Sequence, residues 1–84
     1  MRNITQLALG QKAVISSLSC TGRQRQHMED LGFIPGTIVR PLHHSPSGDP
    51  TAYQVMGAVI ALRRSDASRI SCKPLCDPEG RPNH

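Results

Sequence analysis

Aromatic side chains are almost absent from this 84-residue sequence, which has no Trp, one Tyr and one Phe. Domains that bind proline-rich peptides do so in aromatic-lined grooves, and many proteins that bind single-stranded nucleic acids stack the bases on aromatic rings. Phe33 and Tyr53 alone are too few for either surface. We therefore expect no proline-rich ligand and no nucleic-acid partner.

Long apolar runs are missing as well. No run approaches the roughly 20 residues that cross a bilayer, and the start, Met-Arg-Asn-Ile-Thr, lacks the apolar region of a signal peptide. The three cysteines are an odd number, which does not close a disulfide framework and suits a reducing compartment. We expect a cytoplasmic protein without direct membrane insertion.

Catalytic motifs are also lacking. Ser, Cys and His are present, but no spacing matches a nucleophile elbow or a phosphate-cradling loop. The six acidic residues are scattered singly and form no evident carboxylate pair. A domain this small has little room for a pocket that excludes water. The sequence therefore indicates a protein that is not an enzyme.

The size and charge of the chain allow one small domain with a basic surface. The formal net charge is +4, and 37% of the residues are hydrophobic. Excess positive charge favours acidic partners, although an evenly charged, solvated surface is the simpler interpretation. A thin aliphatic core often needs support from a metal or a partner surface, so we also consider a homodimer.

One stretch in the first half of the chain contains a helix with its start and its end. Thr21 and Gln24 have the spacing of a capping box, which predicts that the helix begins near Gly22. Its apolar stripe is narrow and consists of Met28 and Leu31. Such a helix needs to lie on a larger element to be stable.

The end of this helix is predicted at Gly32, where a left-handed residue can close it. Phe33 is then placed to contact Met28 as the hydrophobic partner of a Schellman motif. The following residues, 34–37, have Pro and Gly at the two central positions of a type II turn. A strand is predicted to start at Thr37.

Five extended runs are predicted as strands: 12–18, 37–42, 51–56, 58–62 and 70–73. Pro41 is expected to end its strand or place it at an edge, because proline cannot donate to a ladder. Residues 43–50 are predicted to form an exposed loop, and Gly57 a tight hairpin reversal. Single helical turns are expected near 3–7, capped by Asn3 or Thr5, and near 63–68, capped by Ser65 or Asp66.

These elements predict a mainly β fold, a small antiparallel barrel of about five strands. One helix lies between the first two strands, and a short helical turn precedes the last. The barrel domain is expected to span residues 1–75. Residues 76–84 have two Pro and a Gly without apolar periodicity, which predicts a flexible tail.

His and Cys residues in two regions could hold a metal. Cys72, Cys76 and His84, with His43 and His44, are soft and borderline ligands that suit Zn(II) or Fe(II). They lack the close Cys-x-x-Cys pairs of a structural zinc site, and adjacent histidines in an extended segment point to opposite faces. Solvated histidines and a buried free Cys72 are the simpler interpretation. The alternative is a labile divalent site that a second subunit completes.

Four blocks of the sequence, taken together and in order, resemble the FeoA family, the small cytoplasmic component of bacterial ferrous iron uptake. The blocks are Gly10-Gln-Lys-Ala-Val-Ile, Leu31-Gly-Phe-Ile-Pro-Gly-Thr, Ser45-Pro-Ser-Gly-Asp-Pro and Gly57-Ala-Val-Ile-Ala-Leu-Arg-Arg-Ser-Asp-Ala-Ser-Arg-Ile. The resemblance runs from about residue 4 to residue 73. One departure is Gln26-His27-Met28, where the family usually carries a Leu, so the helix is expected to pack somewhat differently.

The resemblance implies an SH3-like barrel that needs no cofactor and works beside FeoB, a membrane iron transporter with a cytoplasmic G-protein-like domain. The expected role is an accessory or regulator, recruited to the inner membrane through this partner. The alternative is a small His/Cys metal-binding or metal-sensing module that dimerises through metal. Because the family also resembles the C-terminal domain of iron-dependent repressors, a DNA-linked regulatory domain is a third, weaker alternative.

The residues proposed to contact the partner are Phe33, Ile34, Tyr53, Arg63 and Arg64. Phe33 and Ile34 are either structural or part of an exposed apolar rim. Arginine makes bidentate contacts with carboxylates and phosphates, which suits Arg63 and Arg64 to an acidic partner face. The simpler interpretation is that Arg63 pairs with nearby Asp66, at little gain in stability.

Overall fold

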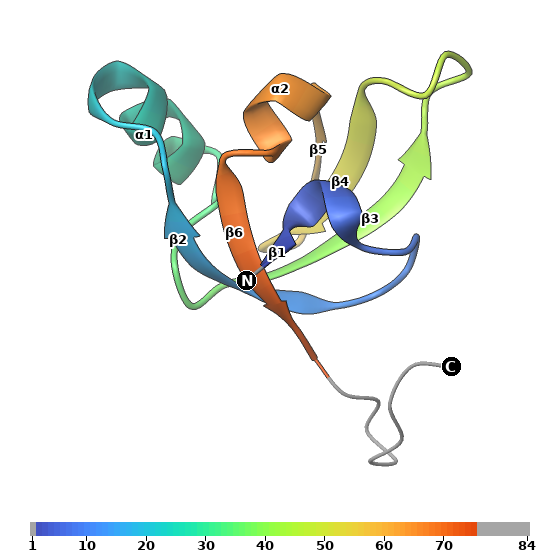
Figure 1. Cartoon of the computed structure of the whole chain (residues 1–84), viewed down its shortest axis with the longest axis horizontal. Helices are drawn as coiled ribbons and strands as arrows, with labels where there is room; N and C mark the ends of the chain where they lie inside the picture. Colours follow the sequence, from blue (N-terminus) through green and yellow to red (C-terminus); the bar gives the residue numbers. More distant parts are fainter. Residues whose placement is uncertain (1, 76–84) are drawn as a thin grey trace.

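A single antiparallel sheet organises the computed structural model, which describes residues 2–75. The hydrogen-bonded strand order is β1-β6-β2-β3-β4-β5 (Figure 1). Along the chain the elements are β1 (Arg2–Asn3), the 3-10 helix η1 (Ile4–Gln6), β2 (Ala13–Leu18), α1 (Gly22–Asp30), β3 (Ile38–His44), β4 (Thr51–Val55), β5 (Ala58–Leu62), α2 (Arg64–Ala67) and β6 (Ile70–Pro74).

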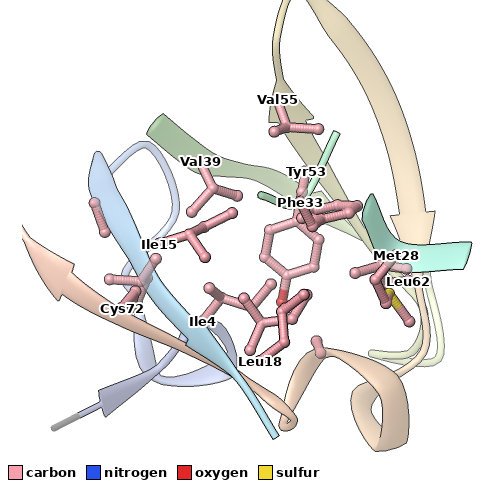
Figure 2. Packing of buried hydrophobic residues seen from close by; sticks show 14 of the residues in the cluster. Ile4, Ile15, Leu18, Met28, Phe33, Val39, Tyr53, Val55, Leu62 and Cys72 are labelled. Atoms are coloured by element: carbon pink, nitrogen blue, oxygen red, sulfur yellow. The ribbon is translucent and has the colours of Figure 1, made fainter. Parts of the chain in front are cut away.

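The sheet curves around one aliphatic core, as the predicted mainly β, SH3-like barrel requires (Figures 1 and 2). Residues from the five longer strands point inward, and Ile4 of η1 and Ala67 of α2 also belong to the cluster. The prediction of one helix between two long strands and a helical turn before the last strand is confirmed. The strand count rises from five to six because the short β1 pairs with β6.

The boundary of the barrel domain at residue 75 stays a prediction. The proposed tail, residues 76–84, lies outside the described residues. No helix in residues 2–75 has the length and apolar character that a bilayer crossing requires.

The end of α1 has the predicted Schellman geometry. The Phe33 N–H donates to the Met28 carbonyl at 3.0 Å, and the Gly32 N–H donates to the Glu29 carbonyl at 3.0 Å. Gly32 has a φ of +107°, a value that favours glycine. This reversal turns the chain so that Phe33 enters the core directly after the helix.

The start of α1 differs from the prediction. The helix begins at Gly22 as expected, but the Thr21 side chain makes no capping hydrogen bond. Gly22 has a φ of +62°, whereas a capping box needs helical backbone angles from the first helical residue. Gln24 instead donates from Nε2 to Asp66 Oδ1 at 3.4 Å, which links α1 to α2. The predicted capping box is therefore wrong.

Pro41 neither ends its strand nor places it at an edge, which corrects the second local prediction. β3 lies between β2 and β4 and continues to His44, so His43 and His44 are strand residues. The proline is tolerated because the ladder with β2 stops at Val39 and the register with β4 shifts after Pro41. The Pro41 carbonyl accepts a hydrogen bond from the Gly10 N–H at 2.7 Å.

The β4–β5 hairpin reverses at Met56 and Gly57, one residue earlier than a strand over 51–56 implied. Val55 pairs with Ala58, so the loop has two residues, and their φ values are +51° and +79°. Two positive φ angles define a type I′ turn, for which Asn-Gly is the preferred sequence. A left-handed Met56 costs about 1–2 kcal/mol relative to a residue that tolerates this conformation.

The two short helical segments take their caps differently. Asn3 caps η1 as predicted: its Oδ1 accepts from the Thr5 N–H at 3.0 Å, and the Gln6 side chain accepts from the Asn3 N–H at 3.1 Å. The turn α2 is not capped by Ser65 or Asp66. Its first N–H, that of Arg64, donates to Asp49 Oδ1 at 2.8 Å, so the cap comes from the β3–β4 loop.

Candidate docking surface

Two of the five predicted contact residues are buried. Phe33 is 0% exposed and Tyr53 is 2% exposed, and both side chains point into the cluster of Figure 2. They belong to the core and drop out of the docking surface. Phe33 is buried because it follows the end of the helix, and Tyr53 is buried because it shares the inward face of β4 with Val55.

Ile34 is exposed, as the rim prediction requires. The chain turns outward here because residues 34–37 form the expected turn, in which the Thr37 N–H donates to the Ile34 carbonyl at 3.0 Å. Gly36 has a φ of +95°, as the third residue of a type II turn needs. Ile34 is thus available for contact. Two residues before it, Gly32 lies beside the Met56 side chain.

Arg63 and Arg64 are exposed at the opposite end of the hairpin. Leu62, just before them, pairs with Thr51, whereas the turn at Met56 lies at the other end of the same two strands. Within the described residues, Arg63 forms no ion pair with Asp66. The ion pair found in residues 2–75 joins Arg25 and Glu29 of α1. The predicted contact residues therefore do not form one continuous surface.

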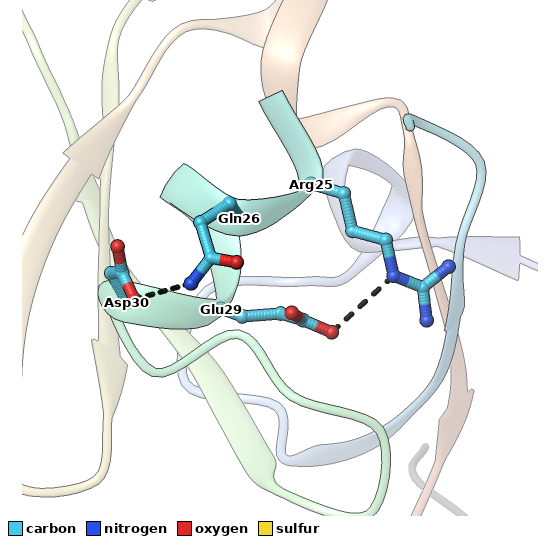
Figure 3. A network of polar contacts seen from close by, with 4 residues as sticks. All are labelled: Arg25, Gln26, Glu29 and Asp30. Atoms are coloured by element: carbon cyan, nitrogen blue, oxygen red, sulfur yellow. Dashed lines mark hydrogen bonds and ion pairs between the residues drawn. The ribbon is translucent and has the colours of Figure 1, made fainter. Parts of the chain in front are cut away.

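The exposed face of α1 is satisfied by its own side chains (Figure 3). Arg25 Nε donates to Glu29 Oε2 at 3.3 Å, and Gln26 Nε2 donates to Asp30 Oδ1 at 3.0 Å. Both pairs have the i, i+4 spacing of helix neighbours. On this face, Glu29 and Asp30 each already accept a hydrogen bond from a neighbouring helix residue.

The predicted metal ligands do not meet within the described residues. His43 and His44 are exposed on β3, and His44 Nδ1 lies 2.7 Å from Thr51 Oγ1. Cys72 is buried in β6. Cys76 and His84 lie outside the described residues, and residues 2–75 contain no group of three His, Cys, Asp or Glu side chains that could hold a metal. The five-residue metal set stays a prediction.

Two buried groups have raised pKa values. Burial raises the pKa of the Tyr53 phenol above its ordinary 10.0, against a hydrogen bond with Thr51 and the charge of Arg64. Burial also raises the pKa of the Cys72 thiol above 9.0, with Arg2 opposing the shift. Cys72 therefore stays protonated at neutral pH and is a poor metal ligand in this state.

The free energy of unfolding is expected to fall as the pH rises above about 9. The unfolded chain loses protons from Tyr53 and Cys72 near their ordinary pKa values, while the folded chain holds them to higher pH. Their stabilising contribution is thus complete below the unfolded pKa values and is lost through the folded ones. Urea titrations from about pH 7 to about pH 11 test this. Tyr53→Phe keeps the ring and should reduce the alkaline loss; an unchanged slope would contradict the linkage.

A further exposed area, which the sequence analysis missed, lies on the outer face of the sheet. Met56 is 69% exposed, Val59 60% and Ile38 48%. Beside them is a shallow depression of about 200 Å³, lined by Lys12, Ile38, Arg40, Gln54, Met56 and Gly57. We call this area the hairpin-side surface. Strand alternation carried a signal for it, because Ile38 and Arg40 flank the inward Val39.

This surface has charge and apolar area but no catalytic arrangement. Its titratable groups are Lys12 and Arg40, and it contains no nucleophile beside a base of the kind that covalent catalysis needs. The fold defines a small SH3-like barrel protein.

Residues 2–74 match the family model of the FeoA domain. The match spans most of the chain, which therefore belongs to the FeoA domain family. This confirms the resemblance found in the sequence and makes the chain a non-enzymatic accessory protein.

A curated relative is the Fe(2+) transport protein A/Fe(2+) transporter FeoB fusion protein of Porphyromonas gingivalis, which is 31% identical over 67 residues. The match covers 80% of this chain and 8% of the fusion protein, so the chain spans a small part of that protein's length.

Two solved structures are similar over almost the whole chain. The FeoA protein of Chlorobium tepidum is 28% identical, with a TM-score of 0.82 over 98% of this chain and 78% of its own. The FeoA of Stenotrophomonas maltophilia, solved in complex with zinc and described as an SH3 domain protein, is 27% identical. Its TM-score is 0.76, with coverage of 99% of this chain and 100% of its own.

Proposed function

We propose that this chain is a cytoplasmic accessory protein of bacterial ferrous iron uptake. It docks on the cytoplasmic G-protein-like part of a FeoB-like transporter and modulates transport, and this contact recruits it to the inner membrane. The observation that carries the proposal is the P. gingivalis relative, in which transport protein A and the transporter FeoB are one polypeptide. Fusion holds two parts at high effective concentration, which favours partners that work in contact.

The structure supports surface docking as the mechanism. The core is filled by apolar side chains, and the described cavity is a shallow depression on the outside of the sheet. The exposed apolar residues Met56, Val59 and Ile38 leave an area that a partner can cover. The net charge of +4 favours an acidic partner face.

The chain is expected to form a complex with the cytoplasmic domain of FeoB and to change its rate of GTP hydrolysis. Size-exclusion chromatography with light scattering measures the complex, and phosphate release measures the rate. The control is the same FeoB domain measured without this chain. Neither a complex nor a change in hydrolysis would remove the docking proposal.

A second candidate function is a divalent-metal module that dimerises through metal. The zinc complex of the S. maltophilia protein, which is 27% identical, favours it. In this chain the ligands would be His43, His44 and Cys72, with Cys76 and His84. Titration with Zn(II) or Fe(II) is expected to double the mass at saturation. Saturable binding that survives in a His43→Ala/His44→Ala variant would place the metal elsewhere, and unchanged mass would remove the metal-linked dimer.

A further inference from the structure

We infer that the depression on the hairpin-side surface is a carboxylate-binding pocket, which receives an Asp or Glu side chain from a partner protein. The inference rests on the proposed function and deepens it, because it names the surface that docks and the chemistry it recognises. The partner segment would carry a carboxylate next to aliphatic side chains. The charged centre of the pocket is Lys12 and Arg40, and its apolar wall is Ile38 and Met56.

The strand register places the two cations side by side. Ala13 of β2 pairs with Val39 of β3, and both side chains are buried. In an antiparallel pair the preceding residue on one strand lies opposite the following residue on the other. Lys12 therefore lies next to Arg40, and the alternation of the strands points both side chains outward.

Arg40 has an unused donor. One of its terminal nitrogens donates to Gln54 Oε1, the residue with which it pairs on β4. Its Nε is buried and has no hydrogen-bond partner. Buried donors of this kind are rare and unfavourable unless a ligand or water accepts from them. Because Nε is buried, a carboxylate in the depression would accept from the terminal nitrogens of the Arg40 guanidinium.

The described residues contain no counter-ion for this pair of cations. No ion pair of Lys12 or Arg40 forms in residues 2–75. The carboxylates there already accept hydrogen bonds elsewhere: Glu29 from Arg25, Asp30 from Gln26, Asp49 from the Arg64 N–H, and Asp66 from Gln24. The positive charge of the pocket is thus available to an external acid.

Met56 makes a second, independent case for contact at this surface. It has a φ of +51° in a turn type that prefers Asn, and most of its side chain is exposed. Its backbone conformation is unfavourable for methionine, and 69% of the residue is exposed to water. A residue that departs from the conformational preference of its position, with no evident compensating gain in stability, points to a functional role. Methionine is flexible and suits surfaces that adapt to a partner.

The apolar wall favours a protein over a free anion. Inorganic phosphate would satisfy Lys12 and Arg40 but leave Ile38, Met56 and Val59 exposed to water. A peptide with aliphatic residues on each side of an acid covers both parts. The chain's own Asp77 and Glu79 are an internal alternative, since they follow Leu75, whose N–H donates to the Lys12 carbonyl at 2.9 Å.

The first test is independent of FeoB. The full chain, labelled with nitrogen-15, is titrated with the blocked tripeptide Leu-Glu-Leu, its Leu-Gln-Leu analogue, and inorganic phosphate. We expect the acidic tripeptide to shift the amides around Lys12, Arg40 and Met56, and the Gln analogue to leave them unchanged. Shifts that phosphate reproduces in full would overturn the peptide as ligand. The Asp77→Asn/Glu79→Gln variant is measured without added peptide. If its Lys12 signal differs from that of the wild type, residues 76–84 occupy the pocket, and the proposal of a partner carboxylate is overturned.

The second test measures affinity for the FeoB cytoplasmic domain by calorimetry. Arg40→Gln is expected to weaken binding by about 10-fold or more, and Lys12→Gln, at an exposed position, by less. Met56→Asn should stabilise the fold and still weaken binding, which separates the two effects. Arg23→Gln on α1 removes the same charge far from the pocket and should leave affinity unchanged. If wild type binds and all three pocket variants bind equally, the pocket fails while the proposed function stands. If wild type does not bind FeoB, the proposed function fails and the tripeptide titration decides the pocket.

Discussion

Replacing Phe33 with Ala is expected to lower the free energy of unfolding by about 3–5 kcal/mol. The ring is fully buried, and it is among the largest fully buried side chains of a thin aliphatic core. A domain of this size has a total stability of roughly 4–12 kcal/mol. The variant should therefore lose a large fraction of its stability, even though the substitution is three residues beyond the helix.

Guanidinium titration followed by far-ultraviolet circular dichroism measures the loss. Phe33→Leu is the matched control, because it keeps most of the apolar volume and should cost about 1–2 kcal/mol. A loss below about 1 kcal/mol for the Ala variant would mean that the ring adds little to the core. It would also return Phe33 to the exposed rim that the sequence had suggested as an alternative.

Gly32→Ala is expected to destabilise the protein by about 1–2 kcal/mol, although alanine is the better helix former. The reason is the backbone: φ is +107° at Gly32, and a Cβ there meets Met56 and Val55 at 3.5–3.6 Å, an ordinary contact distance. The cost therefore comes from conformation and not from a clash. The Schellman hydrogen bonds of Gly32 and Phe33 depend on this angle.

The sign of the change makes this prediction sharp. In an ordinary helical position, Ala in place of Gly stabilises by about 0.5–1 kcal/mol. We expect the stability order Gly, then Asn, then Ala at position 32, because Asn tolerates positive φ better than Ala. Chemical denaturation of the three proteins tests the order. An Ala variant more stable than wild type would show that the helix continues through residue 32.

The docking proposals connect these core residues to function. Phe33 holds the end of α1 against the sheet, and the same reversal places Gly32 beside Met56 at the edge of the hairpin-side surface. Loss of partner binding in a Phe33 variant would therefore reflect unfolding. The surface variants at Lys12, Arg40 and Met56 leave the core intact and report on recognition itself.

The local prediction succeeded where neighbouring residues decide the conformation. The range of α1, its glycine ending, the type II turn and the strand 58–62 follow from residues within a few positions of one another. The capping box of α1 was mispredicted because Gly22 has a positive φ and the Gln24 side chain bonds to a distant residue. The cap of α2 was mispredicted because its actual partner is distant. Asp66 accepts a hydrogen bond from the Gln24 side chain, 42 residues away in the sequence, and Asp49 accepts one from the Arg64 N–H, 15 residues away.

The contact surface was predicted only in part for a similar reason. Ile34, Arg63 and Arg64 are exposed as proposed, but Phe33 and Tyr53 were assigned to a surface and lie in the core. Exposure of an apolar residue depends on which face of the curved sheet it takes. The pocket of Lys12 and Arg40 depends further on the pairing of β2 with β3, which joins residues from two separate strands.

Composition, turn chemistry and hydrophobic alternation in the sequence alone determined a small, mainly β domain with one helix, no catalytic motif and a basic surface. These properties are local or additive along the chain, so they need no knowledge of contacts. Strand order and register, visible only in the tertiary structure, decided which side chains are buried and which cations become neighbours. Burial and the proximity of charges depend on contacts between residues far apart in the sequence, and no short sequence pattern predicts those contacts.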